Sequence, residues 1–415
     1  MKSNSQSFTN KFSESRFKTM TYSNINSSRV SKNARVNDSF FLGYDWVLIS
    51  CSVLLSIIGA ALVYSASKQR LYDAGIATDF YLQRHIFNVV VGLILALIVS
   101  RFSFRTARAY AIIIYGFAIL GLFVVLIPGV GKSQGGAQAW LSLPGGFTFQ
   151  PSEFTKVALI TLLAMVLTER RESEKIPNDK DVLFGLSLAG IPALLVLLQN
   201  DFGTVMIIGA TLLTVLIASG TRLRWVYGSL FVVFFAGFIA SKLNFIKDYQ
   251  LKRLATFVDP TLDPLGAGYN SLQAKIAIGS GGWFGQGYLN GPQTQGKYVP
   301  AQRTDFIFTV AGEELGFLGA TLVIFLMGMI IYRLTKIAIK APDRFGRLTA
   351  IGVAGWFAIQ TFENIGMNLG IMPVTGVPLP FVSYGGSSMF VSWMAIGLAV
   401  AIGREIDDRI TPIIR

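Results

Sequence analysis

The sequence is poor in the side chains that build most metal and nucleophilic sites. It contains one histidine, His85, and one cysteine, Cys51, among 415 residues. A lone cysteine excludes an intrachain disulfide, and one residue of each kind excludes histidine–cysteine zinc sites and Cys/His catalysis. A serine triad would need His85, which nothing in the sequence pairs with. We expect His85 to anchor a helix end at the membrane interface.

Charge is also scarce. Charged residues make up 14% of the chain and hydrophobic residues 52%, whereas roughly a quarter of the residues of soluble domains are charged. The phosphate-binding pattern GxxxxGK[ST] is absent, so direct coupling to ATP is not expected.

Long apolar runs recur along the whole chain. Their lengths are close to the roughly 17–25 residues that cross a bilayer core. They cover residues 46–66, 86–100, 107–128, 154–168, 182–198, 203–219, 226–241, 312–332, 347–369 and 387–403. The pattern predicts an all-α polytopic membrane protein with about ten transmembrane helices and a large extracellular loop between helices 7 and 8.

The basic residues predict the orientation of these helices. With a cytoplasmic N-terminus, the inside segments hold 24 of the 36 Lys and Arg residues, and the short outside segments hold 4. Because positive charge in short loops stays inside, both termini are predicted to be cytoplasmic. The net charge of +13 therefore indicates topology and contact with membrane lipids, and not a nucleic-acid partner.

Three parts of the chain are distinguished by composition. Residues 1–45 are rich in Ser and Asn and predict a disordered cytoplasmic tail. Residues 46–403 form the membrane domain, and 404–415 a short cytoplasmic tail. The extracellular loop 242–311 is patterned: within it, SLQAKIAIGSGG predicts a short amphipathic helix or a re-entrant segment ended by glycines.

Ionisable side chains at membrane depth are functional hypotheses, because they are costly there. In FQPSEFTKVAL, Pro151 suits a first helical turn, and Glu153 and Lys156 can pair on one helix face. The pair either locks the helix end or also meets an anion. In LLQNDFGTVM, Asp201 either caps the next helix or contacts a substrate or metal.

Two further stretches carry candidate groups. In NLGIMPVTGVPLPFVSYGGSSMF, the side chains of Ser383, Tyr384 and Ser387 could bind a polar headgroup, unless the segment is a plain turn. In TDFIFTVAGEELGF, Asp305 lies before the eighth apolar run, whereas Glu313 and Glu314 are expected in its first turn, where they complement the helix dipole.

Asp305 and the cations near it suit one kind of chemistry. A carboxylate can deprotonate a hydroxyl, and Lys or Arg can stabilise a leaving pyrophosphate. The candidate cations are Arg253, Lys275, and either Lys297 or Arg303. A divalent cation, Mg²⁺ or Mn²⁺, bridging pyrophosphate to Asp201 or Asp305 is compatible with this chemistry, but no ligand cluster specifies one.

Six motifs, in this order, resemble the SEDS family of shape, elongation, division and sporulation proteins. They are QPSEFTK, the DFGT turn, YQLKRLATFVDP, DPLGAGYNSLQAKIAIGSGG, TDFIFTVAGEELGF and MPVTGVPLPFVSYGGSS. The resemblance spans about residues 40–410. NIGMNLGIMPVTGVPLPF is more similar to the elongation members than to the division members.

The resemblance implies a peptidoglycan glycosyltransferase in the bacterial plasma (inner) membrane. Such an enzyme polymerises lipid II at the outer face, releases undecaprenyl pyrophosphate, and works with a class B penicillin-binding protein as transpeptidase. The essential aspartate of the family matches Asp305, and its glutamate and lysine match Glu153 and Lys156. A lipid II flippase and a non-catalytic scaffold for the penicillin-binding protein remain alternatives, since carriers also use intramembrane charges and proline-broken spans.

The chain departs from the family pattern at three positions. Ala139 stands where an arginine is usual, which leaves Lys132 as a substitute phosphate contact. Asn200 stands where a proline is usual, and Glu363 where an apolar residue is usual.

Overall fold

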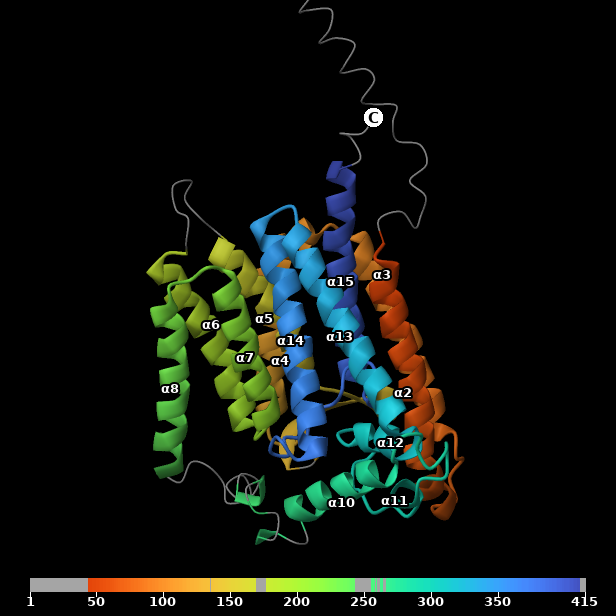
Figure 1. Ribbon diagram of the computed structural model, residues 1–415. Helices are drawn as coiled ribbons and strands as arrows, with labels where there is room; N and C mark the ends of the chain where they lie inside the picture. Colours follow the sequence, from red (N-terminus) through yellow and green to blue (C-terminus); the bar gives the residue numbers. More distant parts are fainter. Residues whose placement is uncertain are drawn as a thin grey trace, which may run out of the picture. The chain divides into compact units, whose positions relative to one another are not determined.

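The computed structural model describes residues 44–134, 136–168, 177–242, 255–257, 259, 262–263 and 266–410. Each of the ten predicted apolar segments overlaps one long helix (Figure 1). The helices are α2 (Trp46–Asp73), α3 (Phe80–Arg101), α4 (Phe104–Leu126), α5 (Pro151–Thr168), α6 (Asp179–Leu198), α7 (Phe202–Ala218), α8 (Leu223–Lys242), α13 (Gly316–Lys340), α14 (Arg344–Leu369) and α15 (Gly386–Ile410).

The predicted class of an all-α polytopic membrane protein is confirmed. Among the described residues, seven helices are long and apolar enough to cross a membrane, and α7 is a shorter apolar helix. The prediction of ten crossings and the sidedness of the long loop stay predictions. The tail 1–45 lies almost entirely outside the described residues.

Short elements gather at one end of the helices, at the bottom of Figure 1, which we call the loop end. They include α10 (Ala267–Ser280), α11 (Pro292–Gln295) and α12 (Ile307–Glu314). Of the two predicted forms of this segment, the structure shows a short helix, and α10 ends before Gly281 as expected; its amphipathic character stays a prediction.

The eighth apolar segment is broken where a continuous helix was expected. Glu313 and Glu314 are the last residues of α12, and α13 begins at Gly316 with φ +69°. The prediction that they complement the dipole of a first turn is wrong. Glu313 instead accepts bonds from the N–H groups of Gln293 (2.6 Å) and Thr294 (2.9 Å) and so caps α11, while Glu314 accepts one from the hydroxyl of Ser65.

A small antiparallel sheet also lies at the loop end, in the glycine-rich segment after α4. Its strands are β1 (Gly131–Gln134), β2 (Ala137–Leu143) and β3 (Phe147–Phe149), in that order. The sequence analysis did not predict it, because the segment lacks a clear alternation of polar and apolar residues. The sheet delivers the chain directly to Gln150 and the start of α5.

The core of the bundle depends on close helix approach. Helix α5 is buried along nearly its whole length and contacts α4, α6, α7, α14 and α15. Helices α3 and α15 pack so closely that a Cβ on Gly397 would lie 2.5 Å from the carbonyl oxygen of Ala96. Gly403, on the same helix, has no such neighbour within 4 Å.

We predict that Gly397→Ala lowers the thermal stability of the detergent-purified protein, because the added methyl overlaps α3. Overpacking of this kind typically costs about 1–3 kcal/mol. Gly403→Ala is the matched control and should be neutral or slightly stabilising, since Ala favours the helix over Gly by about 0.5–1 kcal/mol. Equal melting temperatures for the two variants would contradict the close packing of α3 and α15.

Candidate functional site

A buried ion pair lies at the start of α5. The ammonium of Lys156 is 2.8 Å from Glu153 Oε1, and both side chains are almost completely buried. This confirms the pairing predicted from their spacing, and Pro151 is the first residue of α5, as expected. A buried pair needs further polar contacts to offset its desolvation.

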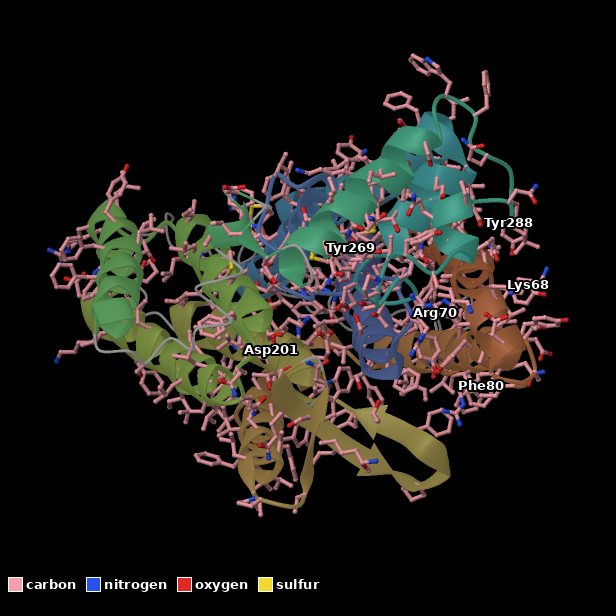
Figure 2. All side chains as sticks on the ribbon, turned by 90° about the horizontal axis from the view of Figure 1, so that it is seen from below. Lys68, Arg70, Phe80, Asp201, Tyr269 and Tyr288 are labelled. Atoms are coloured by element: carbon pink, nitrogen blue, oxygen red, sulfur yellow. The ribbon has the colours of Figure 1, made fainter. Side chains whose placement is uncertain are left out.

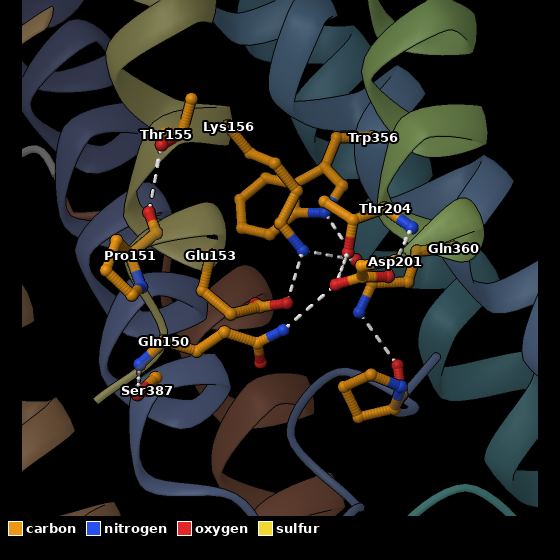
Figure 3. Close-up of polar contacts among 11 residues, drawn as sticks. Gln150, Pro151, Glu153, Thr155, Lys156, Asp201, Thr204, Trp356, Gln360 and Ser387 are labelled. Carbon is orange, nitrogen blue, oxygen red and sulfur yellow. Dashed lines mark hydrogen bonds and ion pairs between the residues drawn. The ribbon is translucent and has the colours of Figure 1, made fainter. Parts of the chain in front are cut away.

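Those contacts come from a distant helix, α14 (Figure 3). Lys156 donates to Gln360 Oε1 at 2.9 Å and lies 4.8 Å from the ring centroid of Trp356. The indole of Trp356 donates to the same Gln360 oxygen. The ammonium therefore uses two of its three N–H donors in hydrogen bonds and lies beside an aromatic ring.

Asp201 caps α7, as one of its two predicted roles required. Its carboxylate accepts bonds from the N–H (3.1 Å) and hydroxyl (2.8 Å) of Thr204 and from the amide of Gln150 (3.1 Å). Figure 3 shows it on the same side of the cluster as Gln360. Burial raises the pKa of the Asp201 carboxyl, against the two bonds from Thr204, and the negative charge of Glu153 raises it further.

A polar ladder on α14 connects this cluster to Asp305. Gln360 donates to the carbonyl of Pro378, and the amide of Asn364 donates to the carbonyls of Val377 (2.7 Å) and Asp305 (2.8 Å). Asn368 also donates to the carbonyl of Asp305, at 3.2 Å. The sequence analysis missed this ladder, although Trp356, Gln360, Asn364 and Asn368 recur every four residues in an apolar helix, which is a detectable signal.

The segment that carries Asp305 is fixed from both sides. Besides the two asparagines, the hydroxyl of Ser383 donates to the carbonyl of Thr304 at 2.6 Å, and the N–H of Tyr384 donates to the carbonyl of Arg303 at 2.9 Å. The carboxylate of Asp305 is partly exposed and lies near Gly376. The backbone that carries the predicted base is therefore held rigidly at the loop end.

A cation and two aromatic rings lie close together, beside the stretch of chain that carries Asp305. The guanidinium of Arg303 lies 4.2 Å from the ring centroid of Tyr81, which contacts Tyr384 edge to face. Burial raises the pKa of the Tyr384 hydroxyl, while the cations of Arg84 and Arg303 act in the opposite direction. The phenol of Tyr384 is therefore a neutral donor at physiological pH.

Arg70, which the sequence analysis did not single out, holds the preceding stretch of chain. From the end of α2 it donates to the carbonyls of Lys297 (3.3 Å) and Val299 (2.8 Å), and Asp73 pairs with the ammonium of Lys297. Figure 2 views this end from below and labels Arg70 nearer the middle of the molecule than Lys68.

Two of the predicted headgroup contacts already have partners within the chain. Ser383 both donates to Thr304 and accepts from the N–H of Leu379, and Ser387 accepts from the N–H of Gln150. These bonds join the loop before α15 to the Asp305 segment and to the start of α5. A substrate role for Ser383, Tyr384 and Ser387 stays a prediction.

The remaining predicted residues are dispersed. Lys275, on α10, is exposed, and its side chain lies against Gly370 at the end of α14. Arg253 lies outside the described residues. His85 is fully buried and stacks on Tyr384, so the expectation of interface anchoring is wrong.

The three departures from the family pattern have structural counterparts. Asn200 has φ +62°, which proline cannot adopt because its ring fixes φ near −65°. Ala139 is fully buried in β2, and Lys132 is exposed on β1 opposite Trp140; a phosphate contact of Lys132 stays a prediction. Glu363 is buried within electrostatic range of Lys156 and Asp201, which adds a further carboxylate to the cluster.

The described residues do not fit a preformed metal site. They contain no group of three or more His, Cys, Asp or Glu side chains that could hold a metal ion. Asp201, the predicted ligand, already accepts three hydrogen bonds. We therefore derive no chemical step through a metal.

Comparison with known proteins decides the family. The family model described as "Cell cycle protein", which groups FtsW, RodA and SpoVE, matches residues 45–407. The chain belongs to this family. The match covers every long helix described above except the last three residues of α15, and it confirms the resemblance found in the motifs.

Curated relatives and solved structures agree with this assignment. The chain is 37% identical to the "Probable peptidoglycan glycosyltransferase FtsW" of Trichlorobacter lovleyi over 86% of its own length and 93% of the relative's. It is also 37% identical to the "Peptidoglycan glycosyltransferase MrdB" of Escherichia coli, with the same coverages.

Two of the similar solved structures each align with 88% of this chain. One, titled "Structural coordination of polymerization and crosslinking by a peptidoglycan synthase complex", has a TM-score of 0.72 and 29% identity and is covered over 99% of its chain. The other is the Rod shape determining protein RodA of Thermus thermophilus, with a TM-score of 0.64 and 28% identity, covered over 98%. The relatives named FtsW and MrdB are thus equally similar to this chain, at 37% identity.

We predict that Lys156→Met strongly destabilises the protein, because it leaves Glu153 buried without its counter-charge. Breaking a buried pair typically costs about 3–5 kcal/mol. The double variant Glu153→Gln/Lys156→Met should recover most of this loss in thermal unfolding. The matched control, Arg222→Met, removes a cation from an exposed pair with Asp179 and should change stability by less than about 1 kcal/mol. A double variant no more stable than Lys156→Met would contradict the account.

We predict that Asp201→Ala destabilises the protein by about 1 kcal/mol through loss of the cap, whereas Asp201→Asn retains the cap. The pH dependence should also differ. Just above the ordinary value of 3.8, the folded chain keeps a proton that the unfolded chain releases. Wild-type stability should therefore fall as pH rises from 3.8 to the raised pKa, and Asp201→Asn should lack this slope. Identical slopes in chemical denaturation would contradict the raised pKa.

Proposed function

We propose that the chain is a peptidoglycan glycosyltransferase that polymerises lipid II into glycan strands, with Asp305 as the general base. The observation that carries the proposal is the fixed backbone of Asp305 at the loop end, where Asn364 and Asn368 donate hydrogen bonds to its carbonyl. The names of the relatives, which are peptidoglycan glycosyltransferases, support the same activity.

Asp305 removes the proton from the 4-hydroxyl of the acceptor's glucosamine in this scheme. The oxygen then forms a bond to the anomeric carbon of the donor, as the bond from that carbon to the pyrophosphate oxygen breaks. Undecaprenyl pyrophosphate leaves with the bonding electrons, and the configuration inverts. A positioned base of this kind contributes typically 10²–10⁴-fold to the rate.

Cations at the loop end support the departure of the pyrophosphate. Arg303 precedes Asp305 by two residues, and Lys275 lies against the end of α14, which also contacts the Asp305 segment. Guanidinium and ammonium groups stabilise charge that develops on phosphate oxygens. Arg253 belongs to the same group of predicted contacts, and Lys156 with Glu153 supports the site from within the bundle. A divalent cation would be held chiefly by the pyrophosphate, because the part of the chain that the structure describes offers no preformed ligand cluster.

The proposal includes a location and a partner. Basic residues are concentrated in the short segments at the end of the helices opposite the loop end. This distribution supports cytoplasmic termini, with the loop end at the outer face of the plasma membrane. The similar solved complex, whose title names polymerisation and crosslinking, supports a class B penicillin-binding protein as the partner. The motif NIGMNLG supports a role in cell-wall elongation and cell shape.

We predict that Asp305→Asn lowers the rate of lipid II polymerisation by about 10²–10⁴-fold, because the variant keeps the shape of the side chain but cannot accept the proton. The measurement is glycan-strand formation from fluorescent lipid II by the purified chain with its penicillin-binding protein partner. Asp79→Asn is the matched control, since Asp79 bonds Gln83 at an exposed site, and it should keep wild-type activity.

The same assay distinguishes the two alternatives. A flippase would move lipid II between leaflets of a vesicle without lengthening it. A scaffold would leave polymerisation by its partner unchanged in the Asp305→Asn variant. Wild-type strand formation by Asp305→Asn would overturn the assignment of the base.

A further inference from the structure

Ala301, four residues before Asp305 in the chain, has a left-handed backbone conformation. Its φ is +49°, a value that residues other than glycine, asparagine and aspartate rarely adopt, because the Cβ then crowds the backbone. The methyl group is exposed, so side-chain packing does not select this conformation. A strained backbone of this kind persists only where the surrounding structure imposes it, and such positions cluster at functional sites.

The carbonyl of Ala301 is the acceptor on which the next residues converge. The N–H groups of Thr304 (3.0 Å), Asp305 (3.1 Å) and Phe306 (3.4 Å) all donate to this oxygen. The hydroxyl of Thr304 donates to it as well, at 3.0 Å. Residues 301–306 therefore form a closed turn around one oxygen, which we call the Ala301 turn.

Buried groups hold the Ala301 turn in place. The side chain of Gln302 is buried, and its amide donates to the hydroxyl of Thr294 at 2.8 Å. At the other end of the turn, Phe306 belongs to the same buried apolar cluster as Val299, which lies just before the turn. Because both ends are fixed in this way, the left-handed residue cannot relax without breaking buried contacts.

Asp305 is thereby held through both of its peptide groups. Its N–H donates to the carbonyl of Ala301, and its own carbonyl accepts bonds from the amides of Asn364 (2.8 Å) and Asn368 (3.2 Å). Since the backbone has only two soft dihedral angles per residue, fixing the peptide planes on either side of the Cα fixes the direction of the Cα–Cβ bond. The bonds from α14 alone would leave the plane before the Cα free to rotate.

We propose that Ala301 is a positioning residue, whose left-handed conformation orients the carboxylate of Asp305 toward the acceptor hydroxyl. The inference rests on the proposed function, in which Asp305 is the base. A general base must lie within about 2.6–3.2 Å of the oxygen whose proton it removes, and a misplacement of about 1 Å can cost about 10²-fold in rate. Ala301 acts through Asp305 and does not touch the substrate.

The test compares two side chains of similar size that differ in how readily they adopt a left-handed backbone. Asparagine adopts it readily, whereas β-branched valine does not. Because the side chain of Ala301 is exposed, neither Ala301→Asn nor Ala301→Val disturbs the packed interior, and their difference reports the backbone conformation. The assay follows strand formation from fluorescent lipid II by the full chain with its penicillin-binding protein partner, over a range of lipid II concentrations.

We expect Ala301→Asn to keep the maximal rate of the wild type and Ala301→Val to lower it by about 10–100-fold. The lipid II concentration that gives half the maximal rate should stay unchanged in both variants. Leu289→Val is the matched control, because Leu289 also has a positive φ, +66°, in the same loop but lies sixteen residues before Asp305. It should lower the melting temperature as Ala301→Val does and keep the wild-type rate.

A wild-type maximal rate in Ala301→Val would overturn the inference. A loss seen only as a raised half-saturating concentration would also overturn it, because the turn would then bind substrate and not orient the base. Equal losses of rate in Ala301→Val and Leu289→Val would do the same, since they would reflect backbone strain in general.

Asp305→Asn in the same assay separates this inference from the proposed function. A wild-type rate in that variant would remove the base itself. A slow Asp305→Asn beside a fully active Ala301→Val would leave the base in place and remove only the role of Ala301.

A second measurement does not depend on the folding of the valine variant. Amide hydrogen exchange of the wild-type protein, followed by mass spectrometry of peptides that cover residues 301–306, reports whether their N–H groups are bonded. The inference expects the N–H of Asp305 to exchange more slowly than in an unstructured peptide of the same sequence. Exchange as fast as in that peptide would overturn it.

Discussion

The structure depends on how one ammonium group, that of Lys156, is neutralised inside the helices. Its contacts with Glu153, Gln360 and Trp356 join α5 to α14, two helices far apart in sequence. Because a buried charge without such partners is strongly destabilising, the mutual position of these helices is restricted. The side-chain amide of Gln360 also donates to the carbonyl of Pro378. This bond holds the loop before α15 against α14.

Helix α14, held against α5 by these contacts, in turn positions the segment that carries Asp305. Asn364 and Asn368 lie one and two turns beyond Gln360 on α14, and both bond the carbonyl of Asp305. Ser383 and Tyr384 hold the neighbouring residues from the loop before α15. The side chain proposed as the base thus has a fixed backbone, as precise proton transfer requires. We propose that the buried pair positions this segment and that the chemistry takes place at the loop end.

Much of this could be predicted from the sequence, where local patterns determine the outcome. Hydropathy located all ten long helices, and the three-residue spacing of Glu153 and Lys156 predicted their pairing. The break between α12 and α13 was missed because the run around Glu313 is apolar on both sides, and the capping of α11 by Glu313 is a tertiary contact. The partners of Lys156 on α14 were missed for the same reason, since Gln360 is 204 residues away. The small sheet was missed because glycine obscures alternation.

The central claim is that Asp305 accepts the proton of the attacking hydroxyl. The most direct measurement is the pH dependence of the rate at which two lipid II molecules are joined in a single turnover. It compares the wild type with Asp305→Glu and Asp305→Asn. The account predicts that the wild-type rate falls on the acid side as one carboxylate is protonated, that glutamate displaces this fall, and that the residual rate of the asparagine variant lacks it. An acid-side fall that is the same in all three proteins would contradict the claim.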